Sequence, residues 1–356
     1  MQPSRRKFFR DSSLLAAAGI AGSRAAAIGQ TQTAPPPPSQ QTPQFETPPT
    51  TRRGDMLYRQ LGSTGVEVSL VGLGGFHIGT PQDPNESTRI IRTAIDRGIT
   101  FLDNCWDYHD GESEVRMGRA LEGGYRDRVF VMSKIDGRTR EAAAKQIDES
   151  LKRLKIDRID LMQFHEIIQL DAPDRVFNDG AWEAMQAAQK AGKVRFVGFT
   201  GHKDPACHLR MLDMAKQHVV HFDTVQMPIN VMDAHFRSFT NQVLPRLVAE
   251  KIAPLGMKPF GGPFVLQEVL RSGIATAIEL QHYVMSLPVS VMITGIDSLQ
   301  ILDQACEAAR TFKPLSAGER KELVNRVAEA AREGKFEKYK TTAQFDGTAK
   351  NPAWLG

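Results

Sequence analysis

The sequence predicts an α/β fold: a (β/α)8 TIM barrel with an N-terminal β-hairpin and a C-terminal helical extension. From about residue 57 onward, short apolar runs of β type alternate with helical patterns. This alternation is typical of a parallel sheet whose crossover connections are helices. Eight such runs favour a closed barrel over an open sheet. At 356 residues the chain is long enough to bury a substantial core.

Residues 1–27 have the order of an export signal. The basic run S-R-R-K-F-F-R at residues 4–10 is followed by an alanine-rich apolar stretch that ends in A-A-A, an A-x-A type cleavage site. The run resembles the bacterial twin-arginine signal, which implies export of a folded protein by the twin-arginine machinery, usually to a periplasm. A basic tail with a chance arginine pair is the weaker alternative. No other run is long and apolar enough to span a bilayer, so we expect no stable membrane insertion after cleavage.

The leader also accounts for the formal charge of the chain. The 45 Lys and Arg against 41 Asp and Glu give a net charge of +4, and residues 1–27 hold five basic groups and one acid, which leaves 40 of each sign. Because the residues after position 27 carry no net charge, their charge gives no reason to expect nucleic acid as a partner. Residues 28–54 are rich in Pro, Gln and Thr and cannot bury enough apolar surface to order themselves, so they are predicted to be a disordered linker. The barrel domain is then expected over residues 55–356.

The elements of the barrel follow in order. Two short β-like arms around a Gly-Ser-Thr-Gly turn at residues 58–69 predict the hairpin. The strands are expected within residues 69–73, 99–103, 129–134, 159–165, 194–199, 222–227, 252–257 and 289–294. The helices are expected to include residues 86–97, 140–154, 179–191 and 298–309, and an amphipathic helix over residues 316–331 begins the C-terminal extension.

Four side chains with complementary acid–base chemistry stand at the ends of three successive predicted strands. Asp103 ends the second strand and Tyr108 follows it by five positions. Lys134 ends the third strand and His165 ends the fourth. The carboxyl ends of parallel barrel strands share one face, so we expect the four groups to lie near one another. Taken singly, each is more often a turn residue, a helix cap or a solvated group. The ordered set indicates a catalytic site.

This ordered set resembles the active-site tetrad of the aldo/keto reductases, and the resemblance extends from about residue 58 to about residue 309. It implies an NAD(P)(H)-dependent enzyme that reduces an aldehyde or ketone to an alcohol, or catalyses the reverse reaction. Tyr108 would donate the proton, and Lys134 would lower the pKa of its phenol. Asp103 would anchor Lys134, and His165 would orient the substrate carbonyl. The alternative is a nucleotide-binding sensor or auxiliary subunit with little turnover.

The resemblance also implies a bound NADPH or NADH across the remaining strand ends. Gln226 matches the family glutamine that binds the carboxamide. Thr200 and Gly201 stand where the family commonly has Ser-Asn. Thr200 keeps the hydroxyl of the serine, but Gly201 lacks the amide side chain of the asparagine. Lys258 is the expected pyrophosphate contact. The run at residues 292–304 resembles the glycine turn and helix start that hold the adenosine part, with the candidate contacts Gly295, Asp297, Ser298 and Gln304.

Two of these positions carry a further expectation. Asp297 stands where many relatives have an arginine or lysine for the 2′-phosphate of NADP. An acid there repels a 2′-phosphate and can accept a hydrogen bond from the free ribose hydroxyl of NAD, so a relaxed or NAD-leaning preference is expected. Ser298 has two equally open roles, as a helix N-cap or as a ligand contact.

The sequence predicts no metal site. Cys105, Cys207 and Cys306 are too few and too scattered for a disulfide framework or an iron–sulfur cluster. His202, Cys207 and His208 are close in sequence, but they form no paired ligand motif.

Overall fold

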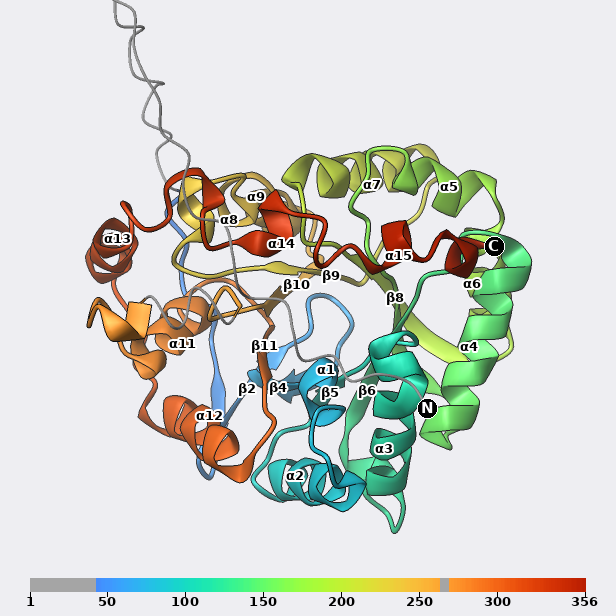
Figure 1. Ribbon diagram of the computed structural model, residues 1–356, viewed down its shortest axis with the longest axis horizontal. Helices are drawn as coiled ribbons and strands as arrows, with labels where there is room; N and C mark the ends of the chain where they lie inside the picture. The colour runs from blue at the N-terminus through green and yellow to red at the C-terminus, as the bar shows by residue number, and fades with distance from the viewer. Residues whose placement is uncertain (1–42, 263–268) are drawn as a thin grey trace, which may run out of the picture. The chain divides into compact units, whose positions relative to one another are not determined.

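A computed structural model describes residues 43–262 and 269–356 and confirms the (β/α)8 barrel. The eight strands pair in parallel with their neighbours, and β11 pairs with β4 to close the ring. Figure 1 shows the helices arranged around these strands. The barrel strands are β4 (Val71–Gly74), β5 (Phe101–Asp103), β6 (Phe130–Ile135), β7 (Ile159–Phe164), β8 (Val194–Thr200), β9 (Thr224–Pro228), β10 (Ala253–Met257) and β11 (Val291–Gly295).

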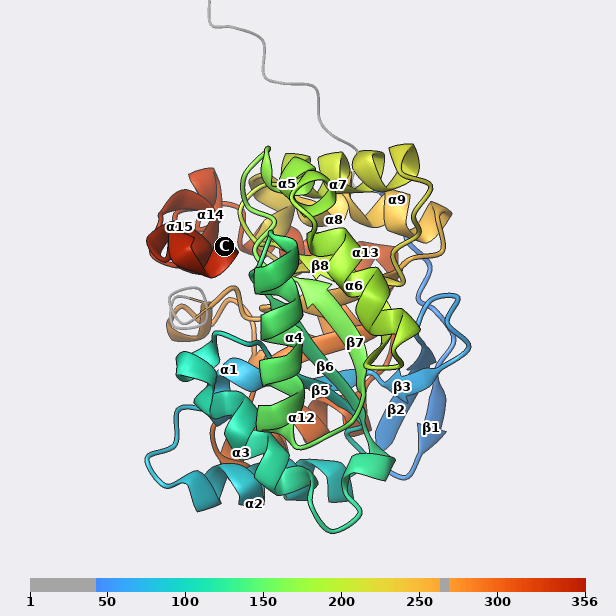
Figure 2. The ribbon, with the colours of Figure 1, turned by 90° about the vertical axis from the view of Figure 1, so that its right-hand side faces the viewer.

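The helices begin where the sequence offers a cap. Asp83, Thr139 and Ser298 accept hydrogen bonds from backbone N–H groups in the first turns of α2, α4 and α12, which satisfies donors that the helix itself cannot pair. The longer helices described are α2 (Pro84–Asp96), α3 (Glu112–Leu121), α4 (Arg140–Leu154), α6 (Ala181–Lys190), α7 (Pro205–Gln217), α11 (Ala277–Met285) and α12 (Leu299–Thr311). The shorter ones include α1 (Gly75–Ile78), α5 (Ala172–Asn178), α8 (Phe239–Gln242) and α9 (Leu244–Ala249). Figure 2 shows α4 and α6 beside the strands β6 to β8.

The predicted hairpin is confirmed, and it closes one end of the barrel. β2 (Met56–Gln60) pairs antiparallel with β3 (Glu67–Ser69). Leu61 and Val68 from this hairpin are buried in the same apolar cluster as Phe101 and Phe130, whose rings stack with centroids 5.4 Å apart. The hairpin therefore excludes water from that end of the barrel, and the opposite end remains accessible to ligands.

The folded domain begins earlier than the sequence predicts. The predicted linker extends to residue 54, whereas β1 (Thr51–Arg53) already pairs with β2. Upstream of β1, the hydroxyl of Thr47 donates to the carbonyl of Ser286, and the carbonyl of Phe45 accepts from Arg320. Backbone pairing orders this polar segment without burying much of it, which is why composition misses it. The predicted signal at residues 1–27 and the linker up to residue 42 lie outside the described residues.

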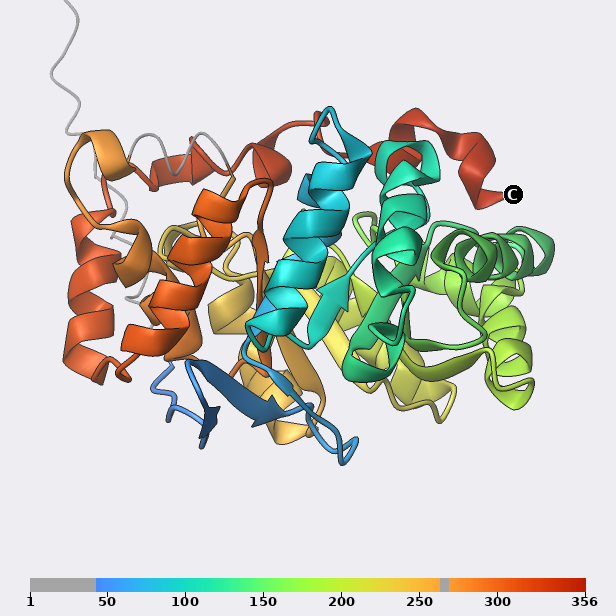
Figure 3. The same cartoon turned by 90° about the horizontal axis from the view of Figure 1, so that it is seen from below.

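The C-terminal extension begins with a helix beside the barrel (Figure 1), and its later part lies over the open end. It contains α13 (Ala317–Arg326), α14 (Lys338–Thr341), α15 (Gly347–Lys350) and a 3₁₀ turn at Pro352–Leu355, so the first helix ends before residue 331. Figure 3 shows the β1–β3 sheet and the C-terminal segment at opposite ends of the barrel. Within the described ranges, no helix combines the length and apolar character needed to cross a bilayer.

Candidate active site

The structure brings the predicted tetrad together around one buried ammonium. Lys134 Nζ lies 2.5 Å from Asp103 Oδ1 and 3.2 Å from the hydroxyl oxygen of Tyr108. It also donates to the carbonyl of Asn104, 2.6 Å away. β5 and β6 are parallel neighbours, so both strand-end residues emerge on the same face. Lys134 and Asp103 are only 1% and 4% exposed, and this burial strengthens their attraction.

Tyr108 reaches this ammonium because the chain after β5 turns sharply. The 3₁₀ turn Tyr108–Gly111 contains His109 and Asp110 at φ values of 53° and 56°, in the left-handed region. Two consecutive residues other than glycine in this region cost conformational energy. The entry to the turn is fixed by the backbone N–H of Trp106, which donates to the carbonyl of Lys134 over 3.0 Å. The strained turn holds the phenol in place.

The pKa of Tyr108 moves in the opposite direction from the prediction. Burial raises the pKa of its phenol well above the ordinary value, and the Asp103 carboxylate adds to the rise. Because Asp103 pairs directly with Lys134, the ammonium has little net field left to stabilise a phenolate. Tyr108 therefore carries its proton at neutral pH, as a proton donor must.

His165 follows β7 and is held by groups from the loop after β6. Its Nδ1 lies 2.9 Å from Asp136 Oδ1, and its carbonyl accepts from Arg138 over 2.5 Å. Burial disfavours the charged imidazolium, but the Asp136 and Asp107 carboxylates outweigh it and raise the pKa of His165. The ring meets that of Tyr108 edge-on at 6.0 Å. With Nδ1 engaged, Nε2 is the nitrogen available to a substrate oxygen. Asp136 was not among the residues indicated by the sequence pattern.

The residues near the nicotinamide position fit an amide ligand. Gln226, at 1% exposure on β9, has a buried Oε1 with no hydrogen-bond partner among the described residues. A buried acceptor without a donor is costly, and a carboxamide N–H would satisfy it. Thr200 is buried at the end of β8 and pairs in register with Gln226. A Cβ at Gly201 would collide with the carbonyl oxygen of Ile167, so the backbone leaves no room for the amide side chain common in the family.

Lys258 fits the expected pyrophosphate contact. It follows β10 in a left-handed conformation, φ 55°, and its ammonium lies over the rings of Tyr339 and Phe345 at 5.5 and 6.0 Å from their centroids. Burial lowers its pKa to about 8, and the nearby ammonium of Lys134 contributes. Within residues 43–262 and 269–356 it forms no ion pair. A partly buried cation of this kind is suited to an anion.

The predicted adenosine-side residues lie around the start of α12. Gly295 ends β11 and packs against the ring of His77, since a Cβ there would collide with that ring. Ser298 accepts from the backbone N–H of Ile301 over 3.3 Å, which establishes its cap role. Asp297 is exposed at the mouth, and Gln304 is half-buried on α12.

Phe76 is a site residue that sequence reasoning missed. It lies in α1, directly after β4, and remains 49% exposed. Its ring meets Tyr108 edge-on at 5.5 Å and that of His109 at 4.6 Å. An exposed aromatic beside the tetrad is suited to contact a bound ligand. The only sequence signal was its position at a strand end.

The histidines in and before α7 (Pro205–Gln217) contact other groups. His208 packs against Phe199 and Phe239 with ring centroids 5.2 and 4.9 Å away. His202 Nε2 instead faces Asp346 of the C-terminal segment at 3.5 Å.

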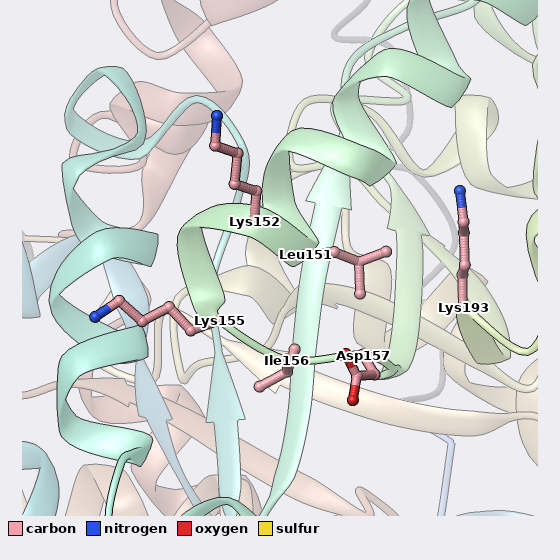
Figure 4. A pocket seen from close by; sticks show the side chains of 6 residues that line it. All are labelled: Leu151, Lys152, Lys155, Ile156, Asp157 and Lys193. Atoms are coloured by element: carbon pink, nitrogen blue, oxygen red, sulfur yellow. The ribbon is translucent and has the colours of Figure 1, made fainter.

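A surface hollow elsewhere is unrelated to the tetrad. It lies between the end of α4 and the starts of β7 and β8, at the opposite end of the strands (Figure 4). Two of its lysines are already paired, Lys155 with Glu122 and Lys193 with Asp148.

Comparison with known proteins decides the family. The model of the aldo/keto reductase family matches residues 70–315. The chain belongs to the aldo/keto reductase family. Aldo-keto reductase YhdN of Bacillus subtilis is 32% identical over 216 residues, which cover 56% of this chain and 61% of that protein. L-galactose dehydrogenase of Arabidopsis thaliana is 32% identical over 154 residues, covering 40% and 48%. These two matches therefore span about half to three-fifths of the relatives' length.

One further relative and a solved structure extend the comparison. The 6-dehydroglucose reductase of Novosphingobium aromaticivorans is 28% identical over 222 residues, covering 58% of this aldo/keto reductase and 69% of the relative. The holo form of aldo-keto reductase AKR11C1 from Bacillus halodurans superposes with a TM-score of 0.65 at 20% identity, covering 79% of this chain and 99% of that one. That likeness shows the shared fold.

Proposed function

We propose that this aldo/keto reductase reduces an aldehyde or ketone to an alcohol, with NADPH or NADH as cofactor. The observation that carries the proposal is the contact of Lys134 Nζ with both Asp103 and the hydroxyl of Tyr108, at 2.5 and 3.2 Å. A protonated phenol beside a buried ammonium is arranged to donate a proton to an oxygen that becomes negative.

Each side chain has one task in the proposed reaction. When bound, the reduced nicotinamide supplies the hydride. Tyr108 donates its proton to the carbonyl oxygen of the substrate. His165, held through Nδ1 by Asp136, presents Nε2 to the same oxygen and orients it. Asp103 accepts a hydrogen bond from Lys134 and holds its ammonium beside the phenol as the phenol loses its proton.

The nicotinamide part of the cofactor is proposed to be held by Gln226 and Thr200, and the pyrophosphate part by Lys258. The turn between β11 and α12 is proposed to hold the adenosine part. Support comes from the buried Oε1 of Gln226, which has no hydrogen-bond partner among the described residues, and from the ammonium of Lys258, which forms no ion pair with them. Asp297 is exposed at that turn, and its charge favours NADH relative to NADPH.

The substrate class and compartment are further parts of the proposal. Two of the relatives are named for sugar substrates, so oxidised sugars are the first carbonyls to test. The leader at residues 1–27 supports export through the twin-arginine machinery. Nicotinamide nucleotides are mainly cytosolic, so we propose that the cofactor is loaded before export and recycled in place by a second substrate.

The test combines binding with turnover. Titration of purified protein with NADH and NADPH, followed by nicotinamide fluorescence, should show binding of both with a modest preference for NADH. Addition of a keto-sugar or a small aldehyde should then oxidise many equivalents of cofactor. Tight binding without multiple turnover would favour the sensor or auxiliary-subunit alternative. No binding, in folded protein free of retained nucleotide, would overturn the reductase proposal.

A further inference from the structure

Four potential ligand atoms lie together behind the catalytic histidine. The side chains of Cys105, Asp107, Asp136 and His165 each place one such atom within 4.8 Å of the other three. From His165 Nδ1, the distances are 2.9 Å to Asp136 Oδ1, 3.3 Å to Cys105 Sγ and 3.7 Å to Asp107 Oδ1. The residues come from the loops after β5, β6 and β7, which is why spacing along the sequence does not reveal the group.

Each of the two carboxylates in the group has one buried oxygen without a hydrogen-bond donor among the described residues. Asp107 Oδ1 and Asp136 Oδ2 are buried and accept no hydrogen bond from the described residues. The side chain of Asp136 is 0% exposed and that of Asp107 is 14% exposed. The guanidinium of the neighbouring Arg138 attracts Asp136, but its N–H groups donate to the backbone carbonyls of Asp136 and His165 and leave these oxygens without a donor. A buried carboxylate oxygen that receives neither a hydrogen bond nor a metal ion is costly.

We propose that Cys105, Asp107, Asp136 and His165 bind one divalent transition-metal ion, with zinc preferred. Around tetrahedral zinc, bonds of about 2.0–2.3 Å place the ligand atoms roughly 3.3–3.8 Å apart. The three distances from Nδ1 need only small adjustments to reach this spacing. A thiolate and an imidazole select zinc over magnesium or calcium, which take oxygen ligands.

The metal would act on catalysis through His165. Bound at Nδ1, it takes the place of the proton on that nitrogen and leaves the proton on Nε2. The imidazole then presents an N–H donor to the substrate oxygen in one fixed tautomer. The metal is a positioning element here and does not touch the substrate. Its entry releases the thiol proton of Cys105 and any proton on Nδ1, so binding is accompanied by proton release.

The competing arrangement uses protons alone. In it, Nδ1–H donates to Asp136 and the thiol of Cys105 donates to a carboxylate. Metal content and ligand-specific spectra distinguish the two arrangements. These readouts do not depend on turnover. Failure of the metal proposal can therefore be distinguished from failure of the reductase proposal.

The experiment uses the full chain, stripped with chelator and reloaded with zinc or cobalt. Elemental analysis should give one equivalent of zinc after desalting, with proton release on binding. The cobalt form should show a thiolate-to-cobalt charge-transfer band and the visible bands of a tetrahedral ion. Cys105→Ser should abolish the charge-transfer band, and Asp136→Asn should weaken zinc binding at least tenfold.

Cys207→Ser is the matched control, because Cys207 is also buried but lies on α7; it should bind cobalt like the natural chain. If Cys105→Ser fails to fold, Asp107→Asn replaces it; this variant keeps the thiolate band and should weaken zinc binding at least tenfold, with circular dichroism to verify its fold. Failure of the natural chain to retain stoichiometric metal would overturn the proposal. Unchanged binding and spectra in folded Cys105→Ser and Asp136→Asn would do the same.

Discussion

Glu166 holds the C-terminal segment over the active site through Thr348. Its Oε2 accepts from the backbone N–H of Thr348 at 2.7 Å and from its hydroxyl at 2.6 Å, while Oε1 accepts from the N–H of Gly347 at 2.8 Å. Burial opposes the charge of Glu166, but His165 and His202 outweigh it, and the pKa of its carboxyl is lowered. The residue that fastens the segment thus directly follows His165, the proposed carbonyl-orienting residue.

Glu166→Gln should loosen the C-terminal segment while the barrel stays folded. A neutral amide has one acceptor oxygen in place of two charged ones, and hydrogen bonds to charged groups contribute about 1.5–3 kcal/mol. Hydrogen exchange of residues 343–356 should therefore accelerate, with the strands unaffected. Glu141→Gln, at an exposed position on α4, is the control. Equal protection in both variants would contradict this role.

Tyr108→Phe should lower kcat by about 10²–10⁴-fold, the range for loss of a positioned general acid. Nucleotide affinity should be unchanged, because the hydroxyl contacts Lys134 and the variant keeps the ring. Tyr125→Phe removes a hydroxyl that, among the described residues, donates to Asp96 at 3.2 Å, and this variant should retain full turnover. Steady-state kinetics with fluorescence titration measures both. Wild-type turnover in Tyr108→Phe would remove the phenol from the mechanism.

Asp103→Leu should destabilise the protein by about 3–5 kcal/mol, because it leaves the Lys134 ammonium buried without its partner. The double variant Asp103→Leu/Lys134→Met removes both charges and should recover much of that loss. Urea unfolding of the two variants measures the difference. A double variant less stable than Asp103→Leu would show that charge burial does not dominate here.

Lys258 should make nucleotide affinity depend on pH. Its pKa in the free protein is about 8, so above that pH the ammonium loses its proton and its attraction for a pyrophosphate. Affinity should therefore be greatest below pH 8, fall as pH rises, and be accompanied by proton uptake above pH 8. Lys258→Met should bind more weakly at pH 7 and with a flatter pH profile. Lys335→Met, at an exposed lysine, should behave like the natural chain.

His208 should make the fold sensitive to acid. Burial lowers its pKa from 6.5 to about 3, so the unfolded chain takes up the proton first and stability falls as pH drops below 6.5. From these pKa values the loss reaches about 2 kcal/mol by pH 5. Urea midpoints at pH 7 and pH 5 should therefore differ less in His208→Leu than in the natural chain. His221→Gln, at an exposed histidine, should leave the difference unchanged.

Sequence predicts features that depend on local pattern. The strands lie within two residues of their predicted ends, because an apolar run bounded by turn residues specifies a buried parallel strand. The proximity of Asp103 and Lys134 could be predicted from the sequence, because the carboxyl ends of parallel barrel strands share one face. Asp136 sits in a loop and Phe76 in the single-turn helix α1, both too short to show periodicity, so only the folded chain shows what they contact. The pKa of Tyr108 depends on burial and on how completely Asp103 neutralises Lys134, which spacing does not contain.

The pairing of β11 with β4 has a consequence for how the chain folds. The ring closes only when residues 291–295 meet residues 71–74, two segments from opposite ends of the barrel sequence. Such a contact joins residues far apart in the sequence and forms late in folding. The chain must first lose the entropy of a long loop, and only then does the contact contribute a favourable energy. A ribosome must release nearly the whole domain before the barrel can complete itself. If a twin-arginine leader holds the product in the cytosol until it is folded, that delay is also the interval in which a cytosolic nucleotide can enter the site.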